Sequence, residues 1–294
     1  MLAVAITAML WGIDYYRHRF VRSDRDLFRL LPPGDATVFY LNVAALRHAG
    51  LLRLLTGAKT AEEADYRSFV RETHFDYERD VDAIAGAVAN QQAFFAIRGR
   101  FDWSRLRQYA AAHGGDCRGS LCETPATHAG RWLSFQAIQP DVMALALSQQ
   151  RGAAQTVRPS AQAFRGAIPD RPVWARVSQS VLKNPAGLPL PLRIFAISLQ
   201  FANPVMLSLS PADEHGEEFK LELDAQCANA AMAETVRNQL DLNTKLLKLE
   251  LAREHVRPNA ADLTGLLTAG AFQVVERRVI ATWPVRKELL QSLQ

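Results

Sequence analysis

The sequence lacks the short motifs that mark well-known catalytic sites. It has no G-x-S-x-G, no H-E-x-x-H, no phosphate-binding loop ending in Gly-Lys-Ser/Thr, and no G-x-G-x-x-G after a strand. Its seven histidines are dispersed along the chain without a shared context. We therefore assign no catalytic residue and no cofactor, and the pattern favours a protein that is not an enzyme.

The chain also lacks a basic folded body. Its formal net charge is +4, but residues 15–30 alone carry five arginines against two aspartates, so the remainder is nearly neutral. A nucleic-acid-binding protein is expected to carry Lys/Arg clusters on its folded surface, with aromatic residues beside them. The sequence thus predicts no nucleic-acid partner, and basic residues next to an apolar segment indicate a membrane-surface flank.

No apolar run is long enough for an ordinary membrane-spanning helix. The N-terminal apolar segment, residues 2–13 (LAVAITAMLWGI), is uncharged, but a spanning helix needs about 20 residues. Three interpretations remain open: an uncleaved signal-anchor whose upstream end is missing, a short interfacial or tilted anchor, and a buried N-terminal helix of a soluble protein. We favour membrane attachment, with membrane lipid as the partner of this segment. The residues expected at the membrane surface are aromatic or basic, namely Trp11, Tyr15, Tyr16, Arg17, Arg19 and Arg22.

Cysteine is scarce, and two of the three cysteines are close together. Cys117 and Cys122 are separated by four residues that include a glycine, a spacing that fits two strands joined by a tight turn. A disulfide between them is one interpretation and would indicate an oxidising compartment. Two unmodified thiols are another. Cys227 stands alone and is predicted to be a small core residue.

A zinc site is the third interpretation of the same segment. His113 and His128 flank the two cysteines in the pattern H-x3-C-x4-C-x5-H, which offers four ligand types that suit zinc. We keep His113, Cys117, Cys122 and His128 as candidate ligands. We assign no metal ion to the chain.

Hydrophobic periodicity predicts an α+β protein of two similar halves, each a mostly antiparallel sheet packed with helices, plus an N-terminal apolar anchor helix. Helices are expected at residues 44–55, 62–73, 76–88, 103–113 and 228–254, and a last one begins after Pro284. Strands are expected at residues 37–43, 92–101, 116–124, 131–138, 142–147, 173–177, 194–201, 205–210, 219–225 and 272–283.

The expected halves come from a comparison of two segments. Residues 81–110 and 261–293 each read as a short helix, a long strand, a tryptophan near the turn and a second helix. The predicted organisation is a membrane anchor at 1–20, a basic linker at 21–35, a first α+β unit at 36–150 and a second at 171–294.

Residues 30–52 (LLPPGDATVFYLNVAALRHAGLL) resemble the opening of some bacterial exported or membrane-anchored proteins of unknown function. In those proteins, a Leu-Pro-Pro-x-Ala turn leads into the first strand of the extracytoplasmic body. The resemblance implies an envelope location and a duplicated α+β body, and it implies no activity and no site residue.

Three hypotheses about function follow. The first is a bacterial inner-membrane protein with a single anchor, a body outside the cytoplasm, and a non-catalytic binding or scaffolding domain that meets an envelope protein. The second is a carrier for lipid or another apolar ligand, held between the sheet and the helix at 228–254. The third is a zinc-dependent enzyme that uses the four candidate ligands.

Overall fold

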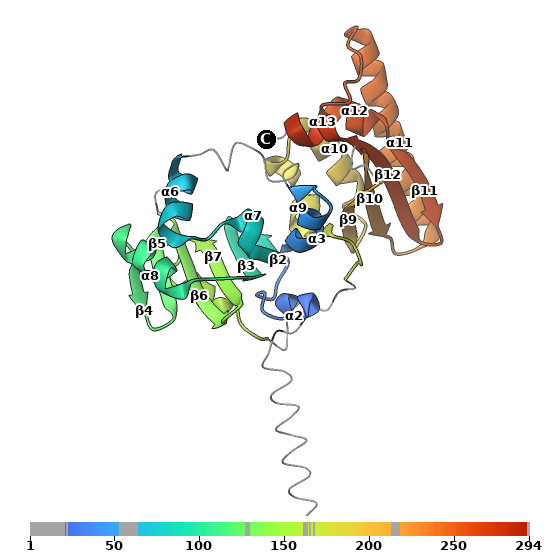
Figure 1. Ribbon diagram of the computed structural model, residues 1–294. Helices are drawn as coiled ribbons and strands as arrows, with labels where there is room; N and C mark the ends of the chain where they lie inside the picture. Colours follow the sequence, from blue (N-terminus) through green and yellow to red (C-terminus); the bar gives the residue numbers. More distant parts are fainter. Residues whose placement is uncertain are drawn as a thin grey trace, which may run out of the picture. The chain divides into compact units, whose positions relative to one another are not determined.

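Figure 1 shows a computed structural model of the chain, which describes residues 21, 23–52, 64–126, 130–160, 164, 166, 168–212 and 218–292. The N-terminal apolar segment, the six residues expected at the membrane surface and His128 lie outside these residues. Within the described ranges, no helix is both long and apolar enough to cross a membrane.

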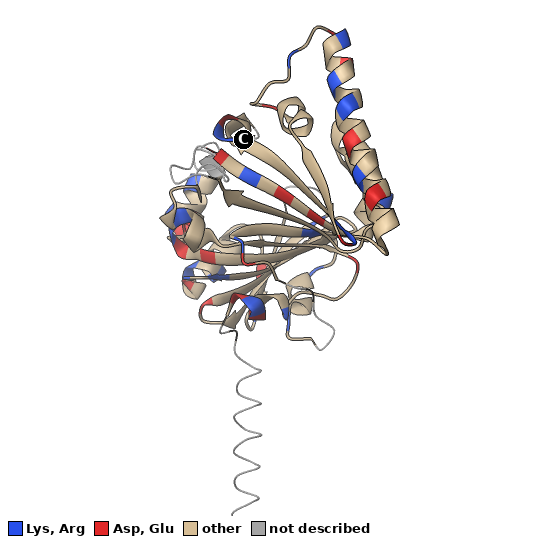
Figure 2. Cartoon of the chain, turned by 90° about the vertical axis from the view of Figure 1, so that its right-hand side faces the viewer, with Lys and Arg blue, Asp and Glu red and all other residues tan. Residues whose placement is uncertain are grey.

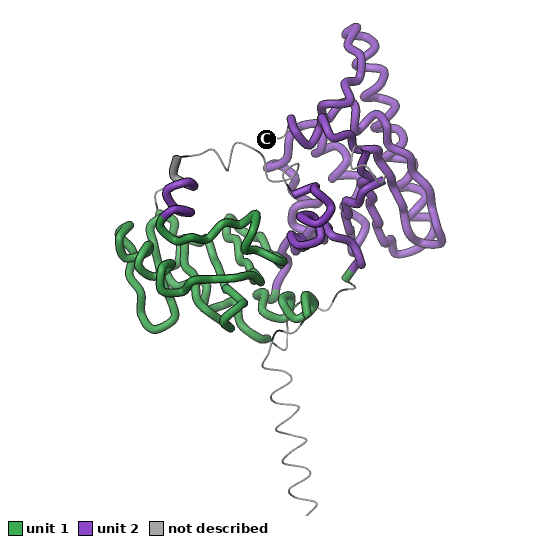
Figure 3. The backbone as a smooth tube through the Cα atoms, viewed as in Figure 1, with its two compact units in different colours: residues 1–33, 72–168 green, residues 34–71, 169–294 purple. Residues whose placement is uncertain are grey.

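The chain forms two compact units that are not continuous in sequence (Figure 3). Unit 1 contains the described residues up to 33 together with those of 72–168, and unit 2 contains those of 34–71 and of 169 onward. The sequence placed residues 36–71 in the first unit. The described residues of this range belong to unit 2 instead, where β1 (Thr37–Leu41) pairs antiparallel with β8 (Val173–Val177).

Unit 1 is an antiparallel sheet with the strand order β2-β3-β7-β6-β5-β4. Its strands are β2 (Val81–Ala89), β3 (Gln92–Gly99), β4 (Asp116–Arg118), β5 (Leu121–Pro125), β6 (Trp132–Gln139) and β7 (Val142–Ser148). Its helical elements are α2 (Asp24–Phe28), α7 (Tyr77–Asp80), α8 (Trp103–Ala112) and η1 (Ala153–Thr156), and α6 (Ala64–Thr73) crosses the unit boundary. Asp102 caps α8 by accepting a hydrogen bond from the Arg105 amide at 3.1 Å.

The helix expected at residues 76–88 is wrong beyond its first turn. Only α7 forms, capped by Asp76, and β2 follows it at once. Small buried side chains alternate along β2 at Ala83, Ala85 and Ala87, so the strand packs closely on one face. Alanine is a strong helix former in isolation, and here tertiary packing overrides that local preference.

Unit 2 is a second antiparallel arrangement, with the strand order β11-β12-β10-β9-β8-β1. Its remaining strands are β9 (Val205–Pro211), β10 (Glu218–Gln226), β11 (Ala271–Val275) and β12 (Arg278–Arg286). Its helical elements are α3 (Val43–His48), α9 (Gln179–Lys183), η2 (Pro185–Gly187), α10 (Leu190–Ser198), α11 (Ala230–Arg253), α12 (Leu263–Thr268) and α13 (Lys287–Ser292).

One face of the unit 2 sheet supplies the core. Leu223, Val279 and Trp283 point to this face and pack with the inward sides of α10, α11 and α12. Alternate positions on β10 carry Lys220 and Glu222 on the opposite face, where they form an ion pair at 2.8 Å. β10 therefore shows the apolar-in, polar-out alternation of a sheet with one buried face.

The strand expected at 272–283 is a hairpin. β11 and β12 are joined at residues 276–277, where Glu276 adopts a positive φ of 55°. Pro284 does not begin the last helix but lies inside β12, and α13 starts at Lys287. Proline is tolerated there because β11 ends opposite Thr282, so β12 has a neighbour on only one side at Pro284.

The predicted fold class is confirmed as α+β with a large antiparallel sheet and helices. The segment comparison behind the two halves is wrong in its first element, because residues 81–89 form a strand whereas Leu263–Thr268 is a helix. That the two units are an internal repeat stays a prediction.

Candidate functional site

Helix α10 is apolar on two sides, although only one of them packs against the core of unit 2. Phe195 and Leu199 face the sheet and are buried. The opposite side carries Leu190, Ile194 and Ile197, and this row continues to Phe201 beyond the helix end; all four side chains are exposed. Their spacing of three and four residues places them in one stripe along the helix.

Helix α11 repeats this arrangement. Asn229 caps it by accepting from the Met232 amide at 2.8 Å, and Val236 and Leu240 are buried against the sheet. On the outward side of its C-terminal half lie Leu242, Leu246 and Leu249, and Leu249 is 67% exposed. The outward stripe again follows the helical period, with steps of four and three residues.

The two stripes belong to neighbouring helices. The Asn243 side-chain amide of α11 donates to the Ser198 hydroxyl of α10 at 2.9 Å, and it also reaches the Ile194 carbonyl at 3.4 Å. We call the combined feature the apolar surface, defined by Leu190, Ile194, Ile197, Phe201, Leu242, Leu246 and Leu249. Exposed apolar side chains that gather on two neighbouring helices are a candidate interaction site, because leaving them in water is unfavourable.

α11 carries charges of both signs along its length, four basic and three acidic side chains (Figure 2). Arg237 pairs with Glu234 at 3.0 Å, and Arg253 pairs with Glu250 at 3.7 Å. The Lys245 ammonium lies 2.7 Å from the Asp241 carboxylate, and its hydrogen bond is the main reason why the pKa of Asp241 lies below its usual value. The apolar surface is thus accompanied by paired charges rather than by a basic band.

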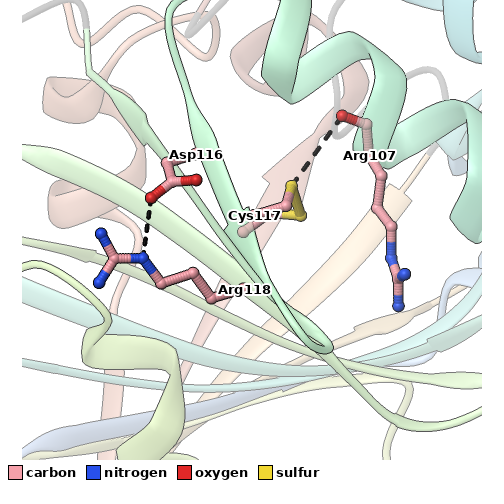
Figure 4. Close-up of a disulfide and its surroundings, with 5 residues drawn as sticks. Arg107, Asp116, Cys117 and Arg118 are labelled. Atoms are coloured by element: carbon pink, nitrogen blue, oxygen red, sulfur yellow. Dashed lines mark hydrogen bonds and ion pairs between the residues drawn. A yellow bond between two sulfur atoms is a disulfide. The ribbon is translucent and has the colours of Figure 1, made fainter.

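The predicted disulfide is confirmed. Cys117 and Cys122 are direct partners across the β4–β5 hairpin, with Cα atoms 4.1 Å apart, and their sulfurs are bonded (Figure 4). The Cys117 sulfur also lies 4.0 Å from the Arg107 carbonyl oxygen of α8 (Figure 4). The bond therefore closes the edge hairpin of unit 1 beside α8.

The zinc hypothesis is wrong for these cysteines, because sulfurs bonded to each other are not the thiolates that zinc requires. His113 instead ends α8, where its Nδ1 lies 2.9 Å from the Tyr109 carbonyl oxygen. Among the described residues, no cluster of three or more His, Cys, Asp or Glu side chains has a metal-binding arrangement. Cys227 is buried in the core of unit 2, as predicted, and burial raises the pKa of its thiol.

Sequence reasoning missed the apolar surface. The sequence predicts a strand at 194–201, which contains Ile194, Ile197 and Phe201, and isoleucine and phenylalanine favour strands. The helical spacing from Leu190 to Phe201 was the available signal, together with Pro189 and Pro191 at the start, where proline is compatible with a helix. That spacing would also have revealed the outward stripe.

Comparisons with known proteins show a similar fold and indicate no activity. The sequence matches no known family and no curated protein. Two crystal forms of the protein TP0453, forms I and III, are similar in structure, with TM-scores of 0.50 and 0.51 at 13% sequence identity. Each match covers 91% of this chain and 96% or 97% of the other. At this identity, the likeness extends to the fold alone.

Proposed function

We propose that this chain is a membrane-anchored bacterial envelope protein with a non-catalytic binding domain, and that the apolar surface binds an amphipathic helix of a partner protein. The observation that carries the proposal is the pair of outward stripes on α10 and α11. Two adjacent helices with exposed apolar stripes present ridges and grooves into which a third helix packs.

The mixed charge of α11 favours a protein over a lipid surface as the occupant. A helix that lies on a membrane is typically rich in Lys and Arg on its polar face. On α11, by contrast, Lys245 and Arg253 each pair with a neighbouring carboxylate. Alternating charges of this kind suit the polar rim of a protein interface, which surrounds an apolar centre.

The anchor and the disulfide support the envelope location. Residues 2–13 are uncharged and apolar, and they are followed by tyrosines and arginines that suit a membrane interface. The disulfide between Cys117 and Cys122 fits an oxidising compartment outside the cytoplasm. We propose that the anchor holds the protein at the inner membrane while the folded body lies outside the cytoplasm.

A carrier of apolar ligands is less well supported. The hypothesis placed the ligand between the sheet and α11, where Ala233, Val236 and Leu240 are fully buried and pack with the sheet residues. These side chains fill the space that such a ligand would need. The outward stripes remain the larger apolar feature of the helices.

The proposal is tested by the size of the native complex. The full chain is extracted from its membrane in mild detergent, and its size is compared with that of the double variant Ile194→Ser and Leu246→Ser. Each lost side chain removes about 1 kcal/mol of apolar contact, so the double variant should bind its partner at least about tenfold more weakly and run as the free chain.

The matched control is Glu234→Gln with Lys248→Gln, two exposed positions of the same helix that lie off the outward stripe and whose replacement leaves the net charge unchanged. The control should retain the large complex, and all three proteins should unfold at similar temperatures because the substituted positions face solvent. A wild-type chain that runs alone, or a double variant that keeps the complex, contradicts the proposal.

A further inference from the structure

Unit 1 contains a cavity of about 490 Å³ where the chain turns from α6 into α7 and where β3 leads into α8. It is open to solvent and lies within the size range of small-molecule sites. Three aromatic side chains form part of its wall. The rings of Phe75 and Phe101 are stacked 5.5 Å apart, and Trp103 lies 5.1 Å from Phe101.

The acidic side chains in the wall already have partners. Asp80 is buried and accepts hydrogen bonds from the Asp76 amide at 2.9 Å and from the Arg79 guanidinium at 2.8 and 3.0 Å, and Arg100 lies at 3.3 Å. Both carboxylate oxygens of Asp102 contact Arg105. Asp80 is thus enclosed, whereas Asp102 is half exposed and keeps lone pairs available, with its charge offset by Arg105.

Two donors in the wall remain open. Arg100 bonds through Nε and one terminal nitrogen, and within the described part of the chain its other terminal nitrogen has no partner. The Nε2 atom of His74 accepts a hydrogen bond from the Arg105 guanidinium, 3.1 Å away. A guanidinium can only donate, so the neutral His74 ring carries its proton on Nδ1, and that N–H also has no partner among the described residues.

The backbone of His74 is in an uncommon conformation. Its φ is 58°, in the left-handed region that only a few per cent of non-glycine residues adopt. The Arg79 guanidinium holds the His74 carbonyl oxygen at 2.9 Å, and the Thr73 hydroxyl accepts from the Phe75 amide at 3.2 Å. Local strain of this kind is characteristic of binding sites, where the surrounding structure enforces it.

We propose that this cavity binds a small anion that carries an aromatic ring, such as an aryl carboxylate or aryl phosphate. The anionic oxygens accept hydrogen bonds from Arg100 and from Nδ1 of His74. The ring packs against Phe101 and Trp103. The two open donors favour a ligand that accepts hydrogen bonds, and a guanidinium binds a carboxylate or phosphate more strongly than a neutral group.

The test measures binding of 2-naphthoate to the folded protein by fluorescence anisotropy, with 2-naphthamide as the neutral analogue of the same shape. Naphthoate should bind about tenfold more tightly than the amide, because a charge-assisted hydrogen bond is lost in the amide. Arg100→Gln should weaken naphthoate binding by about the same factor. 2-Naphthyl phosphate, measured in parallel, decides whether carboxylate or phosphate is the preferred head group.

His74→Gly separates binding from folding. Glycine adopts a positive φ without strain, so this variant should be at least as stable as the wild type and yet bind naphthoate more weakly. His74→Asn tolerates the same conformation and keeps a side-chain donor, and it should recover part of the affinity.

Arg118→Gln is the control for Arg100→Gln, because Arg118 is an exposed arginine paired with an aspartate on the β4–β5 hairpin. It should leave binding unchanged, as should Ile194→Ser in the apolar surface. The proposal is overturned if naphthoate does not bind at millimolar concentration, if the amide binds equally well, or if Arg100→Gln and His74→Gly bind like the wild type.

Discussion

At the scale of single residues, position 99 requires glycine because another part of the backbone lies very close to it. A Cβ atom at this position would lie 2.3 Å from the Asp80 carbonyl oxygen and 3.1 Å from the Val81 Cα. The close approach allows the Arg100 amide to donate to the Asp80 carbonyl at 2.8 Å. Gly99 thus fixes the point where β3 leaves the sheet and the wall of the cavity begins.

Gly99→Ala should destabilise the protein by about 1–3 kcal/mol, the usual cost of forcing extra volume into a packed site. The free energy of unfolding is measured in denaturant. Gly187→Ala is the control, because a Cβ there meets nothing within 4 Å and its φ is not in the left-handed region. Equal stabilities for the two variants would show that β3 and α7 are not packed in this way.

Asp80 should contribute stability in a pH-dependent way. Burial alone would raise the pKa of its carboxyl, but hydrogen bonds from Arg79 and from the Asp76 amide, with the charge of Arg79, outweigh burial and lower the pKa. The stabilisation is therefore complete above the unfolded-state pKa of about 3.9 and is lost as the pH falls through the lower folded-state pKa.

Asp80→Asn should cost about 1–2 kcal/mol at pH 7, a modest value because both arginines are largely exposed and their charges are screened. Urea titrations of both proteins between neutral and strongly acidic pH measure the difference. The gap should close as the pH falls below about 4. A gap that stays constant with pH contradicts the assignment of an ionised, hydrogen-bonded carboxylate.

At the scale of elements, β4 and β5 form the short edge hairpin of unit 1, and the disulfide closes it. In the chain-entropy account, a bond that spans so few residues restricts the unfolded chain by about 2 kcal/mol. Replacing both Cys117 and Cys122 by alanine should therefore lower stability by about that amount. Alanine avoids placing a hydroxyl at Cys122, which is fully buried.

The measurement is thermal unfolding with and without a reductant. Reductant should lower the midpoint of the wild type to that of the double variant and leave the double variant unchanged. If reductant shifts both proteins equally, the disulfide is not the source of the difference.

The sequence predicts an element well when residues close together in the chain determine it, and poorly when distant contacts do. Helix α11 was predicted well, at 228–254, because its inward apolar residues repeat over many turns and Pro258 follows its end. The Cys117–Cys122 hairpin was also predicted, since its spacing requires only a short turn. Both features are decided by residues that are close together in the chain.

Elements decided by distant contacts were missed. Residues 81–89 look helical in isolation and become a strand because β3 pairs along almost their whole length. Residues 194–198 look like a strand and become part of α10, which packs on a sheet built from other parts of the chain. The cavity of unit 1 joins residues near 74 with residues near 101, and no sequence spacing indicates that meeting.

At the scale of the whole molecule, the N-terminal apolar segment should determine where the protein resides. We expect that removing residues 2–13 transfers the folded body from the membrane fraction to the soluble fraction, because this removes the uncharged apolar segment of the chain. Fractionation and immunoblotting of cells that express either form measure the change. Replacing Arg17 and Arg19 by glutamine should weaken attachment less. A truncated chain that remains wholly with the membrane contradicts a role for the segment as the anchor.

The central claim is that the apolar surface of unit 2 is covered by a helix of a partner protein. The most direct test places a photoreactive amino acid at Leu246 in the full chain, in the cells that make it, with the same group at Lys248 as the control, an exposed position on another side of α11. We expect a protein adduct at position 246 that maps by mass spectrometry to one amphipathic helix of a single partner, and no such adduct at position 248. Adducts at position 246 that contain only lipid, only a second copy of this chain, or the same proteins as at position 248 would contradict the account.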